Sequence, residues 1–144
     1  MLVLKEYQQH DIKLCNSEVI LTDEQVSYYE DTHYLRTFID TNTKRIVAVG
    51  MVQKCGEIGL IIDNTLLKKH IRKFYTLLVI YAAEEFAYID TDTLFTGIKP
   101  NTRDQRWIKF LGFEPSLFND IDHESIGWGT FELPLSRWVY ECNN

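Results

Sequence analysis

The sequence feature that most constrains the fold lies between residues 58 and 89. A short apolar run, "IGLII", leads into a long stretch in which apolar residues recur at spacings of three and four. This pattern predicts a strand followed by an amphipathic helix over residues 66–89, with Thr65 as its cap. The recurring positions are Leu67, Ile71, Phe74, Leu78, Tyr81 or Ala82, and Phe86.

Apolar, β-branched runs joined by short polar turns precede this helix. "LRTFID" and "RIVAVGMVQK" are separated by "TNTK", and "KCGE" leads into "EIGLIID". Three strands with such short connections predict an antiparallel meander. Within residues 1–35, "TDEQVSYYEDTHYL" predicts a helix, because Thr22 and Gln25 have the spacing of a capping box.

The last third of the chain predicts further strands and one more helix. "TLFTGIK" is an apolar strand, and "PNTRDQRWIKFLGFEP" is a helix with Asn101 as its N-cap and Gly112 at its end. "SIGWGTFELPLSRWVYE" predicts one or two strands, with Pro134 at an edge or a bulge. A chain of 144 residues without a linker is expected to form a single domain, residues 1–144.

Cysteine and apolar content indicate a reducing, intracellular location. Three widely separated cysteines form no CxxC pair, and the histidines lack metal-ligand spacing, so neither disulfides nor a metal site are expected. There is no signal peptide and no apolar run of ~18 residues, so we expect a soluble cytoplasmic protein without membrane association.

The charge of the chain is negative overall but unevenly spread. A net charge of −6 argues against a general nucleic-acid binder and suits a small amine or a basic protein as partner. Residues 65–112 hold 8 Lys and Arg against 5 Asp and Glu, whereas residues 113–144 hold 1 against 6. The middle third is therefore the basic segment.

Two stretches are candidates for chemistry. The start of the long helix carries Lys68, Lys69, Arg72 and Lys73, with His70 beside them, so it is either a phosphate site at a helix N-terminus or a solvated helix face. Asn101 follows a strand, on the side where open α/β sheets bind ligands, or it is only a helix cap.

Residues 45–113 resemble the GCN5-related N-acetyltransferases, which transfer an acetyl group from acetyl-CoA to an amine. The order of meander, long helix, strand ending in Asn101, helix and Gly112-Phe113 exit is similar to that family. The resemblance implies an α/β (α+β) fold, in which helices flank a mixed, mainly antiparallel central sheet. It also implies that Glu57 is the general base.

The same resemblance implies where acetyl-CoA would bind. It would lie between "GLIID", including Ile61 and Ile62, and "TLFTGIK", with Asn101 nearby. Its pyrophosphate would lie against the helix start, which comprises Lys68, Lys69, His70, Ile71, Arg72, Lys73 and Phe74. This chain differs from the family at two points. Its helix start has no glycine where the family's pyrophosphate loop has them, and Ile108 stands where many members have a tyrosine general acid.

These differences keep several functions open. "KKHIRKFYTLL" and "FLGF" are similar to the small acetyltransferase-like proteins of tailed phages. The resemblances accordingly imply either an N-acetyltransferase, phage-encoded by the second resemblance, or an inactive protein of that fold that serves as a virion component or binds a host protein. A DNA mimic is a third option, and it requires the acids of residues 18–31 and 114–124 to share one face.

Overall fold

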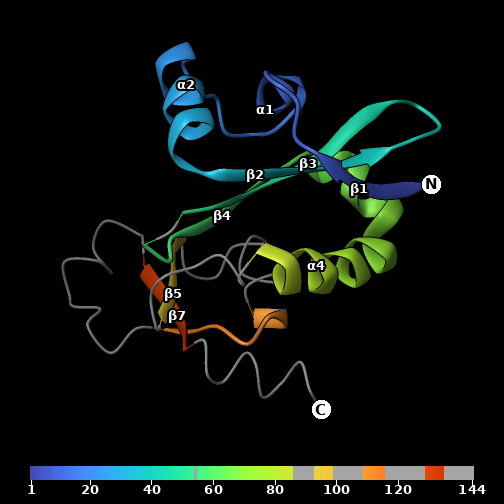
Figure 1. Cartoon of the computed structure of the whole chain (residues 1–144). Coiled ribbons are helices and arrows are strands. Elements are labelled where there is room, and N and C mark those ends of the chain that lie inside the picture. The colour runs from blue at the N-terminus through green and yellow to red at the C-terminus, as the bar shows by residue number, and fades with distance from the viewer. Residues whose placement is uncertain (54, 86–92, 99–108, 116–128, 135–144) are drawn as a thin grey trace. The chain divides into compact units, whose positions relative to one another are not determined.

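The computed structural model describes residues 1–53, 55–85, 93–98, 109–115 and 129–134 (Figure 1). The chain divides into two compact units. The first unit comprises Met1–Lys54 and Ile58–Tyr88, and the second comprises Cys55–Glu57 and Ile89–Asn144. The single domain expected over residues 1–144 stays a prediction. In the described part of the chain, no helix is long and apolar enough to span a membrane.

A four-stranded antiparallel sheet forms the centre of the first unit. Its order is β1-β2-β3-β4, and the strands are β1 (Leu2–Glu6), β2 (Tyr34–Asp40), β3 (Arg45–Val52) and β4 (Ile58–Ile62). The meander predicted from residues 35–63 is confirmed as β2-β3-β4. Strand β1 was not predicted, because its short sequence "LVLKE" lacks a regular apolar and polar alternation.

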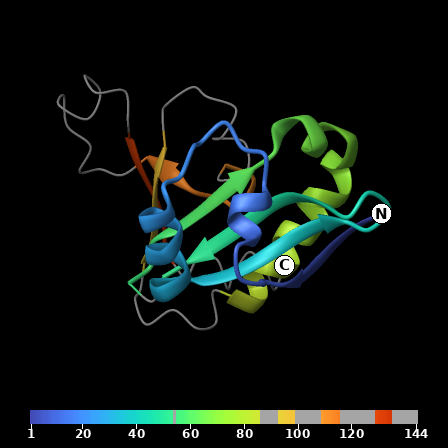
Figure 2. The same cartoon turned by 90° about the horizontal axis from the view of Figure 1, so that it is seen from above.

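Helices cover both faces of this sheet (Figures 1 and 2). One face carries α1 (Asp11–Leu14) and α2 (Asp23–Thr32), and the other carries α4 (Ile71–Glu85). The predicted capping box of α2 is confirmed, since Thr22 and Gln25 exchange side-chain to backbone hydrogen bonds of 3.2 and 2.9 Å. The mixed α/β fold class is therefore as expected.

The two sheet faces hold separate parts of the core. Under α4, the ring of Phe38 lies 5.2 Å from that of Phe74 and 5.7 Å from that of Tyr81. The opposite face holds a cluster under α1 and α2, formed by Ile12, Cys15, Val26, Ile46, Val49, Met51 and Ile61. Because both faces are covered, β3 is buried over all but its first residue, which explains its nearly continuous apolar sequence.

The second unit contains a three-stranded antiparallel sheet with the order β5-β7-β6. Its strands are β5 (Thr93–Ile98), β6 (Glu114–Pro115) and β7 (Gly129–Pro134). The strand predicted in "TLFTGIK" is confirmed as β5, and β7 confirms one strand within "SIGWGTFELPLSRWVYE", the rest of which lies outside the described residues. Strand β7 lies between β5 and β6, but β6 pairs only with Phe131 and Glu132 in the described part of the chain. Among the described residues Pro134 is therefore paired on one side only, with Thr93 of β5, and its position at an edge or bulge stays a prediction.

Gly112 ends a helical segment in the second unit, as predicted. Residues 109–110 are helical, and Gly112 has a φ of 97°, a left-handed conformation that glycine adopts without strain. Asn101 and Ile108 lie outside the described residues, as do most of the acids at 114–124.

Candidate functional site

The junction between β4 and the following helix is capped by Asp63 and not by Thr65. Asp63 has an extended backbone, and its Oδ1 accepts hydrogen bonds of 3.1 Å from the N–H groups of Thr65 and Leu66. Its carbonyl oxygen accepts a further bond of 2.9 Å from Leu67. The expected Thr65 cap is wrong because Thr65 already lies inside the helix. An Asp directly after an apolar strand is a strong N-cap and was the available signal.

The helix therefore begins earlier than predicted. The first segment, α3 (Asn64–Leu67), runs into a 3₁₀ turn, Lys68–His70, and then into α4. Leu67, Lys68 and Ile71 all have right-handed helical backbone angles. The first-turn amide groups thus belong to α3, and the amide groups at 69–74, expected to face a phosphate, lie farther along a continuous helical chain.

Four of the predicted residues share an exposed, cationic side of this helix. Lys68, Lys69, Arg72 and Lys73 are all exposed, and their spacing places them close together along one side. Among the described residues, none of the four is part of an ion pair. Ile71 lies between them, with 40% of its surface exposed. This cationic surface, defined by these five residues, can attract an anion.

Two other predicted residues of the same segment point away from solvent. Phe74 is 1% exposed and packs on Phe38. His70 is partly buried, and its Nε2 lies 3.3 Å from Oδ2 of Asp40. Ile61 and Ile62 at the end of β4 are also buried, at 7% and 8% exposed. Phe74 is thus buried as its helical spacing predicts, whereas the contact of His70 with Asp40 was not indicated by the sequence pattern.

Asp40 joins the end of β2 to the helix start and to the N-terminus. Burial opposes its ionisation. However, hydrogen bonds from the Asn42 N–H, the N-terminal ammonium, the Thr43 hydroxyl and the His70 ring outweigh burial and lower the pKa of Asp40 to about 2. The carboxylate is thus held ionised beside the predicted site.

We expect Asp40 to make the fold sensitive to acid. A carboxyl whose pKa is lower in the folded than in the unfolded state stabilises the fold above its unfolded pKa of about 4. That contribution is lost as the pH falls from about 4 to about 2. In urea unfolding, the wild type should therefore have a higher free energy of unfolding than Asp40→Asn at pH 5, and this difference should narrow by pH 2.5. A difference in free energy that stays constant over this range would contradict the lowered pKa of Asp40.

Asp63 also determines the electrostatics of the helix start. It is 2% exposed, and within the described part of the chain its Oδ2 has no hydrogen-bond partner; the nearest cation is the Arg45 guanidinium, at 3.5 Å. A carboxylate at a helix N-terminus is stabilised by the helix dipole. It also takes the place that a phosphate would need, because it accepts from the same free amide groups.

Glu57 lies in the second unit, immediately before β4. It is half-buried and forms an isolated parallel bridge with Phe95, whose N–H donates a 2.8 Å hydrogen bond to the carbonyl of Gly56. The role of Glu57 as a base stays a prediction. The described residues contain no group of three or more His, Cys, Asp or Glu that could hold a metal ion.

Comparison with known proteins identifies the fold. No family model matches the sequence, and no curated protein matches it. A variant of the spermidine N-acetyltransferase SpeG from Vibrio cholerae is similar in structure, with a TM-score of 0.66 and 14% identity over 98% of both chains. This is the GNAT fold.

Two further structures of the GCN5-related N-acetyltransferase (GNAT) type support this assignment. The ribosomal-protein-S18-alanine N-acetyltransferase from Escherichia coli has a TM-score of 0.61 and 11% identity, over 93% of this chain and 94% of the other. An acetyltransferase of the GNAT family from Bacillus anthracis has a TM-score of 0.57 and 15% identity, over 91% and 92%. At these identities the likeness establishes the GNAT fold, and activity has to be argued from the residues.

Proposed function

We propose that this chain is an N-acetyltransferase that transfers the acetyl group of acetyl-CoA to an amine. The observation that carries the proposal is the exposed cationic surface at the helix that follows β4, in a chain with the GNAT fold. Lys68, Lys69, Arg72 and Lys73 supply positive charge that suits a diphosphate. Ile71 adds an apolar contact within the same surface.

The residues present fit acetyl-CoA through side chains and not through a glycine loop. The cationic surface matches the charge of the diphosphate, whereas the first-turn amide groups of α3 are already bonded to Asp63. We infer that Lys68, Lys69, Arg72 and Lys73 would hold the diphosphate. Charge-only contacts of exposed side chains are screened by salt, so binding should weaken steeply as ionic strength rises.

The proposed chemistry assigns one step to Glu57. Acetyl-CoA supplies an activated acetyl group as a thioester. Glu57 removes a proton from the substrate ammonium, directly or through a water, so that the neutral amine can attack. Because Ile108 stands where many members of the family have a tyrosine, water is the proton donor to the leaving thiolate. General acid help is typically worth ~10²–10⁴-fold, so we expect slow turnover.

The acceptor is proposed to be a small amine or the amino group of a basic protein. The net charge of −6 favours cationic molecules. The compared enzymes are named for spermidine and for an alanine of a ribosomal protein. Both acceptors are amines, which agrees with the class of acceptor proposed for this chain.

Asp63 favours a second candidate function. A buried carboxylate at the helix N-terminus repels a phosphate, which suits a GNAT-fold protein that has lost catalysis and binds another protein. If the chain is phage-encoded, as its basic helix start suggests, that partner would be a host protein in the cytoplasm or a component of the virion.

Calorimetry with acetyl-CoA tests the proposed enzyme. Lys69→Glu and Arg72→Glu should each weaken binding roughly tenfold, because each removes a charge-assisted contact and adds repulsion. Lys13→Glu is the matched control, since it makes the same change of net charge on α1, which covers the other sheet face. Equal loss in all three variants would reject a local phosphate site.

Acetyl-CoA binding by Asp63→Ser distinguishes the proposed enzyme from the protein-binding candidate. Serine retains a capping oxygen but removes the negative charge, so it should leave α3 capped and tighten acetyl-CoA binding several-fold. Absence of binding at millimolar acetyl-CoA in both the wild type and Asp63→Ser would reject the enzyme and leave the protein-binding candidate.

A further inference from the structure

A pocket of about 360 Å³ lies beside α1, which Figure 2 shows over the strands of the sheet. Its charged lining residues come from β1, α1, the β2–β3 turn, the first residue of β3 and the residue after β4. They are Lys5, Asp11, Lys44, Arg45 and Asp63, and all belong to the first unit. We call this cavity the Asp63 pocket.

Asp63 contributes an unsatisfied oxygen to this lining. Its Oδ1 accepts the N–H bonds that cap α3, whereas its buried Oδ2 accepts no hydrogen bond from the described residues. The Arg45 guanidinium lies 3.5 Å from Oδ2, which is longer than the ~2.7–2.9 Å of a charge-assisted hydrogen bond. Arg45 therefore balances the charge of Asp63 without donating to it. What Oδ2 lacks is a hydrogen-bond donor and not a second cation.

Two cations of the lining are available to an anion. Lys44 is exposed, and it takes part in no ion pair with another described residue. The Arg45 side chain is 54% exposed, and a guanidinium has five N–H donors, more than one carboxylate oxygen can use. Lys5 differs, because it donates a 3.0 Å hydrogen bond to Asp11, whose Oδ2 accepts two further bonds. Lys44 and Arg45 are thus the groups that can receive an anion.

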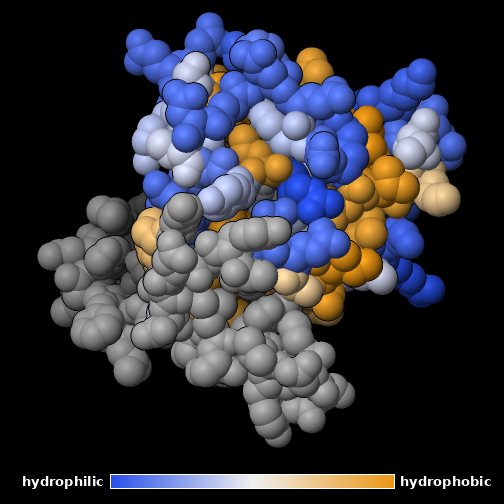
Figure 3. Space-filling view, viewed as in Figure 1, coloured by the Kyte–Doolittle hydropathy of each residue, from blue (hydrophilic) through white to orange (hydrophobic). Residues whose placement is uncertain are grey.

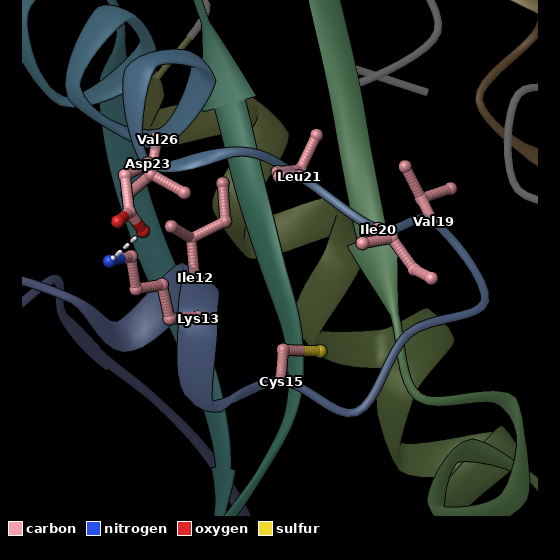
Figure 4. Close-up of a pocket in the computed structure, with 8 residues that line it drawn as sticks. All are labelled: Ile12, Lys13, Cys15, Val19, Ile20, Leu21, Asp23 and Val26. Carbon is pink, nitrogen blue, oxygen red and sulfur yellow. Dashed lines mark ion pairs between the residues drawn. The ribbon is translucent and has the colours of Figure 1, made fainter.

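A smaller pocket on the same sheet face has no comparable group. Its volume is about 210 Å³, and its polar side chains already have partners (Figure 4). Lys13 is paired with Asp23, and the Cys15 thiol lies 3.8 and 3.9 Å from two backbone carbonyl oxygens. The unsatisfied carboxylate oxygen therefore distinguishes the Asp63 pocket as the stronger candidate for a ligand site.

The lining limits the chemistry of that ligand. A metal ion or a free amine would be repelled by Lys44 and Arg45. A simple anion would pair with these two cations but would leave Oδ2 of Asp63 without a donor. A molecule that carries both an anionic group and a hydroxyl meets both requirements. Hydrophilic residues cover most of the α1–α2 side visible in Figure 3, with small apolar areas between them, which suits a small polar ligand.

We propose that the Asp63 pocket binds a small phosphate monoester that also carries a hydroxyl group, of the polyol or sugar phosphate class. The phosphate lies against Lys44 and Arg45, whose two positive charges match its charge of about −1.5 to −2 at neutral pH. The hydroxyl of the ligand donates a hydrogen bond to Oδ2 of Asp63. This binding is independent of acetyl transfer and uses no residue of the cationic surface.

Calorimetry with glycerol 3-phosphate tests the proposal on the full chain. Glycerol 3-phosphate should bind saturably, and its affinity should fall as salt is added. Propyl phosphate has the same charge but no hydroxyl, so it should bind roughly tenfold more weakly, the usual effect of losing a hydrogen bond to a charged group. Equal affinity for the two compounds would contradict recognition of a hydroxyl.

Asp63→Ser tests the contact with the hydroxyl. Serine retains a capping oxygen but removes Oδ2. The substitution also removes a negative charge, so both phosphates should bind at least as tightly as before, and the informative quantity is the ratio of their affinities. The preference for glycerol 3-phosphate over propyl phosphate should fall from roughly tenfold to near one. A preference that persists in Asp63→Ser would show that another group recognises the hydroxyl and would overturn the assignment.

Lys44→Gln tests the contact with the phosphate. It removes one of the two cations and should weaken glycerol 3-phosphate binding roughly tenfold. Lys13→Gln is the matched control, since it makes the same change of net charge on α1, outside the Asp63 pocket. Both lysines are exposed, so the melting temperature should change little in either variant.

Lys69→Glu separates this site from the proposed acetyl-CoA site. It should leave glycerol 3-phosphate binding unchanged, because Lys69 belongs to the cationic surface and not to the Asp63 pocket. Loss of binding in Lys69→Glu would place the phosphate at the cationic surface and overturn the proposal. So would equal losses in Lys44→Gln and Lys13→Gln, or the absence of saturable binding at millimolar glycerol 3-phosphate. Binding that only Lys44→Gln weakens would support the proposal even if acetyl-CoA does not bind.

Discussion

Phe74→Ala is expected to lower the free energy of unfolding by about 3–5 kcal/mol. Phe74 is 1% exposed, and its ring lies 5.2 Å from that of Phe38, between α4 and the sheet. Removing the ring loses apolar burial and leaves a cavity that the closely packed surroundings fill only in part. Guanidinium unfolding of the full chain, followed by circular dichroism, measures the change.

Ile71→Ala is the matched control on the same helix. Ile71 is 40% exposed, so its truncation should change the unfolding free energy by less than about 1 kcal/mol.

Substitutions at Ile71 and Phe74 also test the predicted acetyl-CoA site. Ile71→Ala should weaken acetyl-CoA binding if the cationic surface holds the diphosphate, whereas Phe74→Leu, which retains a large apolar group, should not. Comparable stability of Phe74→Ala and Ile71→Ala would contradict the packing described for α4.

Local sequence patterns predicted the strands and helix ends that neighbouring residues in the sequence determine. The β2-β3-β4 meander follows from β-branched runs and short turns, and the cap of α2 follows from Thr22 and Gln25 three residues apart. Strand β1 pairs with β2, and the paired residues are 30 or more positions apart in the sequence. Its five residues carry too little pattern to indicate that pairing, so it could not be predicted.

The helix after β4 shows how a small local change alters a periodic prediction. Leu67, Phe74 and Leu78 are buried as their spacing predicts, but Ile71 is exposed. The 3₁₀ turn Lys68–His70 separates Leu67 from Ile71, so the helical spacing is interrupted between these two residues. Ile71 is the first residue of α4, whereas Phe74, about one turn later in the same helix, packs on Phe38 of the sheet.

Part of the candidate site depends on contacts that no local pattern contains. Lys68, Lys69, Arg72 and Lys73 could be placed together because helical spacing alone sets their positions. The pairing of His70 with Asp40 joins residues 30 positions apart. The hydrogen bonds from the first-turn N–H groups to Asp63 depend on the residue at which the backbone first becomes helical. Helix ends are the least predictable part of a helix.

Gly50→Ala is expected to destabilise the first unit by about 3 kcal/mol, because it overpacks the contact between β3 and α4. A Cβ atom at Gly50 would lie 2.5 Å from Cζ and 2.6 Å from the hydroxyl oxygen of Tyr81. The Tyr81 ring is 4% exposed and packs edge-on against Phe38, so it cannot move aside freely. The absence of a side chain at Gly50 is thus required by the approach of this ring.

Tyr81 provides the variants that identify the clash. Among the described residues its buried hydroxyl has no hydrogen-bond partner, so Tyr81→Phe removes an unsatisfied group that costs about 1–3 kcal/mol and should be neutral or stabilising. Gly50→Ala combined with Tyr81→Leu should lose less stability than the sum of the two single changes, by at least about 1 kcal/mol. Additive losses would mean that Gly50 is needed for another reason. A strong loss in Tyr81→Phe would mean that the hydroxyl has a partner, and that α4 is held to the sheet by a hydrogen bond as well as by packing.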